Sequence, residues 1–268
     1  MSRPRQLVVY FVAVYLLTWG IAAVIGLAPS VVAALGPVGT GSPLFYLAVY
    51  VPSVTGVVLT GLFEGRAGLS GLGRRLNPLR LRLVWYLIAF LALPIAGSAW
   101  VLATGHPLEL ASLSAVPTIL GSSLLLDPGP IGEELGWRGF ALPRLLEQFS
   151  PAMAALILGV VWGIWHLPVF VIPGFPQNGL NFPLFIVSTV TLTILMTWCH
   201  LHTGGHLLPA IIVHLMANHT GELIGSQFGG QGAGLAVLSV LILGLDRKRF
   251  FARPAGGPTP SAVAPTAT

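Results

Sequence analysis

The stretch AVPTILGSSLLLDPGPIGEELGWRGFALPRL (residues 115–145) decides how this chain folds. It is apolar enough to lie in a membrane, but the tetrapeptide DPGP (127–130) interrupts it. Because prolines donate no backbone hydrogen bond, the helix should break there, and a new helix should begin near Ile131 with Pro130 in its first turn. A broken helix at membrane depth survives only where protein or a water-filled cavity satisfies the freed backbone groups. The break therefore indicates a cavity.

The composition of the whole chain favours a membrane protein. Of its 268 residues, 54% are hydrophobic and only 8% are charged, whereas a soluble domain carries about 25% charged residues. A spanning helix needs about 20 mostly apolar residues. Apolar segments lie at 7–27, 43–63, 83–104, 115–145, 152–173, 182–201, 207–224 and 230–245. We predict an all-α polytopic membrane protein with about eight transmembrane helices, of which the fourth is broken.

The chain is predicted to form a single transmembrane helical domain over residues 1–250, with a catalytic core at about 120–225. The basic start and the long apolar run that follows it are interpreted as a retained first transmembrane helix, because the run is too long for a signal-peptide core. Residues 251–268 are rich in Pro, Ala and Thr. They are predicted to form a disordered cytoplasmic tail.

The basic residues predict the topology. A net charge of +5 would suggest nucleic acid in another chain, but here the basic residues lie at the ends of apolar segments, and we expect no nucleic-acid partner. The outer loops near 28–42, 105–114, 174–181 and 225–229 contain no Lys or Arg. The positive-inside rule then places both termini in the cytoplasm of a multi-pass protein in the cell membrane. With Cys199 as its single cysteine, the chain has no intramolecular disulfide.

Ionisable groups within apolar helices are costly and usually functional. The segment GEELGWRG (132–139) contains three of them. Glu134 and Arg138 are four residues apart and share a helix face, so we expect a structural ion pair between them. Glu133 points about 100° away and has no charge partner in its own helix. This difference predicts that Arg138 holds Glu134, while Glu133 is free to act.

Two further polar pairs lie on other apolar segments, again with partners four residues apart: Trp162 with His166, and His214 with Asn218. Counted from the inner helix ends, the pairs lie at a depth similar to that of Glu133 and are expected to converge in a pocket open to the cytoplasm. Such a pocket suits amide hydrolysis by an activated water. Glu133 would be the general base, His166 would share the water, and the third pair would stabilise an oxyanion.

These clusters resemble the motifs of the CAAX prenyl protease and bacteriocin-immunity family (CPBP, or Abi) of intramembrane peptidases. The family motifs are Glu-Glu-x-x-x-Arg, Phe-x-x-x-His and His-x-x-x-Asn. They appear here in that order at residues 133–138, 162–166 and 214–218, with Trp162 in place of phenylalanine. The resemblance covers roughly residues 120–225.

The resemblance implies an intramembrane endopeptidase that acts on a membrane-associated peptide or protein, prenylated substrates among them. Its expected partners are membrane lipid and a membrane-anchored or lipidated peptide. The catalytic site residues that it implies are Glu133, Glu134, Arg138, His166, His214 and Asn218. Family members are described both as metalloproteases and as glutamate-based enzymes, and the residues leave both open. A divalent metal such as zinc, if one takes part, would be held by Glu133, His166 and His214.

Two other functions are compatible with the same residues. Intramembrane charges and a broken helix also mark the substrate path of a transporter. A non-catalytic membrane protein that binds a partner, as in an immunity role, would need the same buried polar groups. Against transport, the chain shows no duplicated half, and its polar groups gather in one region.

Overall fold

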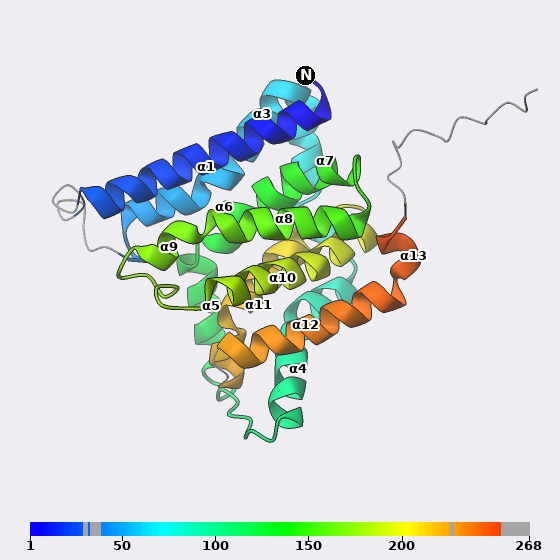
Figure 1. Ribbon diagram of the computed structural model, residues 1–268. Helices are drawn as coiled ribbons and strands as arrows, with labels where there is room; N and C mark the ends of the chain where they lie inside the picture. Colours follow the sequence, from blue (N-terminus) through cyan, green and yellow to red (C-terminus); the bar gives the residue numbers. More distant parts are fainter. Residues whose placement is uncertain (29–31, 33–38, 226–227, 253–268) are drawn as a thin grey trace, which may run out of the picture.

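The computed structural model describes residues 1–28, 32, 39–225 and 228–252. Within these residues every regular element is a helix (Figure 1), which confirms the all-α prediction for the described part of the chain. Residues 253–268 of the predicted tail lie outside it.

The main helices fall where the apolar segments predict them. They are α1 (Arg3–Leu27), α3 (Pro43–Arg74), α4 (Leu83–Ala103), α5 (Val116–Leu126), α6 (Gly129–Gly136), α7 (Leu142–Leu146), α8 (Pro151–Trp165), α9 (Leu167–Val171), α10 (Phe182–His202), α11 (Leu208–Ile224), α12 (Phe228–Leu245) and α13 (Arg247–Phe250). A 3-10 turn, η1 (Pro78–Arg80), and a π-helical turn, η2 (Trp137–Ala141), complete the set.

Four helices are long and apolar enough to cross a membrane: α1, α3, α4 and α10. The apolar helix α8 and the apolar part of α12 are shorter. The described residues therefore support a membrane protein, while the number of eight spans stays a prediction.

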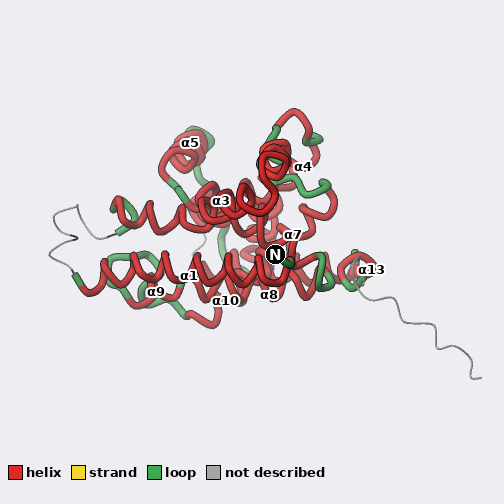
Figure 2. The backbone as a smooth tube through the Cα atoms, turned by 90° about the horizontal axis from the view of Figure 1, so that it is seen from above, coloured by secondary structure: helices red, strands yellow, loops and turns green. Residues whose placement is uncertain are grey.

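The helices form two layers. In Figure 1, α1, α8, α10 and α12 lie side by side in front, and α3, α6, α11 and α4 lie behind them. Seen from above, α3 and α1 belong to different layers (Figure 2). The first residue and α13 lie at the same end of the bundle (Figure 1). This agrees with an even number of crossings, although the cytoplasmic placement of both termini stays a prediction.

The predicted break in the fourth segment is confirmed. Helix α5 ends at Leu126, and α6 begins at Gly129 with Pro130 in its first turn. Because a proline in the first turn lacks only an N–H that has no helical partner, the new helix tolerates it. The helix then passes into the π-helical turn η2 before α7. The segment after the break is thus not one regular α-helix.

One predicted boundary was wrong and one is close to the structure. Helix α3 has a kink at Gly65, whose conformation is non-helical (φ 64°), near the predicted end of the apolar segment at 63, and a second helical stretch then continues to Arg74. The segment predicted as one helix over 152–173 is divided at His166 into α8 and α9. The division follows from Pro168, which cannot donate a backbone hydrogen bond and whose ring would clash with the carbonyl one turn earlier in a continuous helix.

Helix α6 packs closely against α3 because glycines face the contact. A Cβ atom built on Gly132 would lie 2.9 Å from the Val49 carbonyl oxygen. A Cβ atom on Gly136 would overlap the Pro52 carbonyl and the Tyr10 hydroxyl. The glycines thus bring the backbone of α6, which carries Glu133 and Glu134, directly onto α3.

We predict that Gly136→Ala destabilises the protein by at least about 1–3 kcal/mol, the usual cost of overpacking, because backbone has to move to admit the methyl group. Thermal unfolding of the purified protein in detergent measures the change. Gly20→Ala in α1 is the matched control, since a Cβ atom there meets nothing within 4 Å. An unchanged unfolding temperature for Gly136→Ala would contradict the close packing of α6 on α3.

Candidate active site

The two glutamates of α6 are both buried but have different partners. Glu133 is 4% exposed, and its Oε2 accepts a hydrogen bond of 2.6 Å from Trp162 Nε1 on α8. Glu134 is fully buried, and its Oε1 accepts from Arg138 at 2.9 Å and contacts His214 Nδ1 at 2.8 Å. Consecutive residues point about 100° apart on a helix, so the two carboxylates face different neighbours. The ion pair expected between Glu134 and Arg138 is confirmed.

Arg138 is fully buried and joins three helices. Besides its pair with Glu134, its guanidinium donates to Thr193 Oγ1 on α10 at 2.8 Å. It also lies over the Trp162 ring, with Cζ 4.4 Å from the ring centroid. A buried charge is tolerated when opposite charge, hydrogen bonds and an aromatic face surround it. Arg138 thus holds α6, α8 and α10 together at the site.

Trp162 lies at the centre of the site and contacts both histidines. Its ring centroid is 5.2 Å from that of His214 and 5.7 Å from that of His166. His166 Nδ1 lies 2.9 Å from the Trp162 carbonyl oxygen. Because a carbonyl oxygen only accepts, the proton of a neutral His166 sits on Nδ1, and Nε2 keeps a lone pair. Among the described contacts, no hydrogen bond joins His166 directly to Glu133.

Helix α11 supplies the third group. Nε2 of His214 and Nδ2 of Asn218 lie 3.3 and 3.4 Å from the point that a Cβ atom on Gly129 would occupy, and Asp127 Oδ1 lies 3.1 Å from it. The two nitrogens therefore face the same space beside the start of α6. A contact between Asn218 and Asp127 was not predicted from the sequence. Asp127 Oδ2 accepts from Asn218 Nδ2 at 2.8 Å.

The sequence analysis missed other polar neighbours as well. Asp127 was predicted only as part of the helix break, and His219 was left out because it adjoins the third motif but points off its main face; its Nε2 lies 3.2 Å from Asp127 Oδ2. The indole N–H of Trp162 and the hydroxyl of Thr193 were also missed as partners. A polar residue inside or beside a broken apolar helix is the signal that could have identified Asp127.

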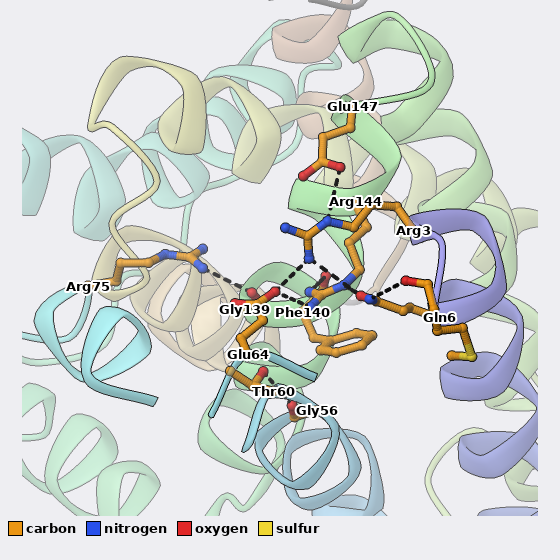
Figure 3. A network of polar contacts seen from close by, with 11 residues as sticks. Arg3, Gln6, Gly56, Thr60, Glu64, Arg75, Gly139, Phe140, Arg144 and Glu147 are labelled. Atoms are coloured by element: carbon orange, nitrogen blue, oxygen red, sulfur yellow. Dashed lines mark hydrogen bonds and ion pairs between the residues drawn. The ribbon is translucent and has the colours of Figure 1, made fainter. Parts of the chain in front are cut away.

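The π-helical turn after the glutamates is held by two arginines from elsewhere in the chain (Figure 3). Arg75 donates to the carbonyl oxygens of Arg138 and Gly139, both at 2.9 Å, and Arg144 donates to that of Phe140 at 2.8 Å. Arg144 also pairs with Glu64 at 2.6 Å. A cavity of about 480 Å³ lies among these arginines and Gly139. The predicted pocket at the glutamates is a different region, and its opening to the cytoplasm stays a prediction.

Residues 113–220 match the family described as type II CAAX prenyl endopeptidase Rce1-like. They include every motif residue of the candidate site, and the resemblance to the CAAX prenyl proteases is thereby confirmed.

The chain is also similar to CAAX prenyl protease 2 of Methanococcus maripaludis. The two are 32% identical over 132 residues, which are 44% of this chain and 47% of that relative. The chain therefore matches about half the length of this curated relative. Neither comparison names a bacteriocin-immunity protein, so that part of the motif resemblance stays a prediction.

The side chains of the candidate site are not arranged as a set of metal ligands. Zinc needs three or more nitrogen, oxygen or sulfur ligands at about 2.0–2.3 Å. Among the described residues, no group of three His, Cys, Asp or Glu side chains is arranged to hold an ion. The chemistry proposed below therefore contains no metal step.

We predict that Arg138→Met destabilises the protein by about 3–5 kcal/mol, because it leaves the buried Glu134 carboxylate without its partner. Adding Glu134→Gln should recover part of the loss, since the uncompensated charge is then gone. Thermal or denaturant unfolding in detergent measures both variants. Arg3→Met is the control, because its ion pairs with Glu64 and Glu147 are both partly exposed and such pairs contribute little. A double variant less stable than Arg138→Met would contradict this account.

We also predict that Trp162→Phe lowers kcat/KM for peptide cleavage about tenfold, with little change in unfolding temperature. Phenylalanine stands at this position in the motif that the chain resembles, so the variant keeps an aromatic ring in place. Glu133 loses its N–H donor, and a hydrogen bond to a charged group contributes about 1.5–3 kcal/mol. Trp198→Phe is the control, since Trp198 stacks with Trp85 and His202 outside the site. Wild-type kinetics for Trp162→Phe would show that the indole N–H does not position Glu133.

Proposed function

We propose that this chain is an intramembrane endopeptidase in which Glu133 activates the attacking water. The observation that carries the proposal is the division of labour between two adjacent buried carboxylates. Glu134 is paired through Oε1 with both Arg138 and His214, and its Oε2 is buried without a partner, whereas Glu133 has no charged partner within hydrogen-bond distance and receives a hydrogen bond on Oε2 alone, from Trp162. No described residue donates to Glu133 Oε1. A fixed carboxylate with one oxygen available is what a general base requires.

The first step is attack of water on the carbonyl carbon of the scissile peptide bond. Glu133 Oε1 takes one proton of the water as its oxygen bonds to that carbon. The lone pair on His166 Nε2 accepts a hydrogen bond from the same water and orients it, because the Nδ1 proton is directed at the Trp162 carbonyl. The product of this step is a tetrahedral intermediate with a negative oxygen and a protonated Glu133.

Two nitrogens of α11 are placed to stabilise that oxygen. His214 Nε2 and Asn218 Nδ2 face one space beside Gly129. His214 donates from Nε2 in its imidazolium form, and the Glu134 carboxylate beside Nδ1 supplies the opposite charge. Glu133 then returns its proton to the amide nitrogen as the C–N bond breaks, which releases an amine and a carboxylic acid, and the acid proton passes to the amine to give an ammonium and a carboxylate. Atoms and charge balance without a further reactant.

A lipid-anchored peptide is the substrate class that we propose. The matched family is that of CAAX prenyl endopeptidases, and the Methanococcus maripaludis relative is named a CAAX prenyl protease. In a CAAX sequence the cysteine carries the prenyl group, which binds membrane. Helices α1, α3, α4 and α10 are apolar enough to hold the site within a bilayer, where such a substrate resides.

The test is cleavage of a fluorogenic CAAX peptide, prenylated or not, by purified protein in detergent. We predict that Glu133→Gln and His166→Ala each lower kcat about 10²–10⁴-fold, the usual contribution of a positioned acid–base group. Glu147→Gln is the matched control, because Glu147 is exposed and pairs with Arg3, and none of its described contacts is to a residue of the candidate site. The prenylated peptide should be cleaved with the higher kcat/KM.

The possible outcomes separate the alternatives. Cleavage that persists in Glu133→Gln would overturn the assignment of the base. Binding of the prenylated peptide by wild-type protein without cleavage would favour the non-catalytic, partner-binding role. Activity that a strong chelator abolishes and zinc restores would overturn the metal-free chemistry; we expect activity to survive chelation.

A further inference from the structure

Asp127 lies in the break between α5 and α6, outside all three sequence motifs, yet it contacts the candidate oxyanion site. Its Oδ2 accepts from Asn218 Nδ2 at 2.8 Å, and its Oδ1 accepts from the backbone N–H of Gly129 at 2.9 Å. The Gly129 bond closes a local turn of the kind that Asp residues favour. The Asp127 carboxylate is therefore fixed to the start of α6 by one oxygen and to α11 by the other.

The chemistry of this contact decides which way the amide of Asn218 points. An asparagine side chain has a donor end, NH₂, and an acceptor end, C=O. A carboxylate only accepts, so Asp127 selects the NH₂ end. One N–H of Asn218 is used by Asp127, and the second stays available in the space that His214 Nε2 also faces. If the amide were reversed, a carbonyl oxygen would face the developing oxyanion and repel it.

A carboxylate near an oxyanion is itself unfavourable, and His219 is placed to offset it. His219 Nε2 lies 3.2 Å from Asp127 Oδ2, and its Nδ1 lies 3.2 Å from Glu222 Oε1. Both contacts are hydrogen bonds at once only when both ring nitrogens carry protons, that is, in the imidazolium form. The charge of that ring balances the charge of Asp127 on the side away from Asn218.

We propose that Asp127 is a positioning residue for peptide hydrolysis, which holds the Asn218 amide with its NH₂ group toward the oxygen of the scissile carbonyl. The inference rests on the proposed function, because it assigns Asp127 a task within that reaction. It explains why an acidic residue occupies the break in an apolar segment, where an uncharged turn residue would serve the backbone equally well.

The experiment is a double-mutant cycle between Asp127→Asn and Asn218→Ala, measured with the peptide cleaved by the wild type. Loss of one oxyanion donor costs about 10²–10³-fold in kcat, which is the effect expected for Asn218→Ala. Asp127→Asn keeps the shape of the side chain and an acceptor for Gly129, but its NH₂ group then faces Asn218 and donates to the carbonyl end of that amide. We expect it to lower kcat about 10–100-fold with little change in KM.

The two effects should not multiply. If Asp127 acts through Asn218, the double variant is about as active as Asn218→Ala alone, because nothing remains to position. A double variant reduced by the product of the single effects would overturn the inference and indicate a general structural role. The matched control is Asp246→Asn, which removes a comparable Asp–His contact of 3.3 Å to His202, away from the site. It should retain wild-type kcat, and all variants should keep the wild-type unfolding temperature.

A second measurement is independent of catalysis. The chain has asparagine at four positions, 77, 178, 181 and 218, so ¹⁵N-asparagine labelling gives few side-chain amide signals, and Asn218→Ala identifies the relevant one. Exchange of the Asn218 amide protons with water should be faster in Asp127→Asn than in the wild type. Equal exchange rates would overturn the inference even if the enzyme is active. A wild type that does not cleave but shows the exchange difference would instead refute the proposed function and leave the Asp127–Asn218 coupling intact.

Discussion

The buried ion pair between Glu134 and Arg138 is the interaction on which the rest of the site depends. An apolar environment tolerates charge only when the charge is paired and its hydrogen bonds are made. Each partner therefore recruits groups from other helices: Glu134 contacts His214 on α11, and Arg138 donates to Thr193 on α10. The requirement to satisfy two charges thus fixes the relative positions of α6, α10 and α11, and with them the third polar pair.

The same pairing leaves the neighbouring carboxylate available. Glu133 lies on another face of α6 and meets α8, where Trp162 donates one hydrogen bond to it. Two identical side chains, adjacent in sequence, thus acquire different chemistry because a helix turns them toward different neighbours. Trp162 further links Glu133 to both histidines through ring contacts.

Helix α6 has irregular backbone at both ends, and side chains hold both irregularities. At its start, Asp127 accepts the N–H of Gly129 within the break. At its end, Arg75 and Arg144 donate to three carbonyl oxygens of the π-helical turn. Backbone groups freed within an apolar region need such partners. The eight-residue helix that carries both glutamates is therefore anchored from both sides and held close to α3 by its glycines.

Local spacing in the sequence by itself determined the helix break at 127–130, the Glu134–Arg138 pair and the all-helical character of the described residues, because these follow from residue types within one or two turns of a helix. The division of the segment at His166 was missed, although Pro168 was visible. Only the tertiary structure decided which side chains from different elements meet. The indole N–H of Trp162 donates to Glu133, His214 contacts Glu134, and Asp127 accepts from Asn218. These contacts join residues far apart in the chain, and their choice depends on how apolar helices pack, which the hydrophobic pattern does not encode when nearly every helix face is apolar.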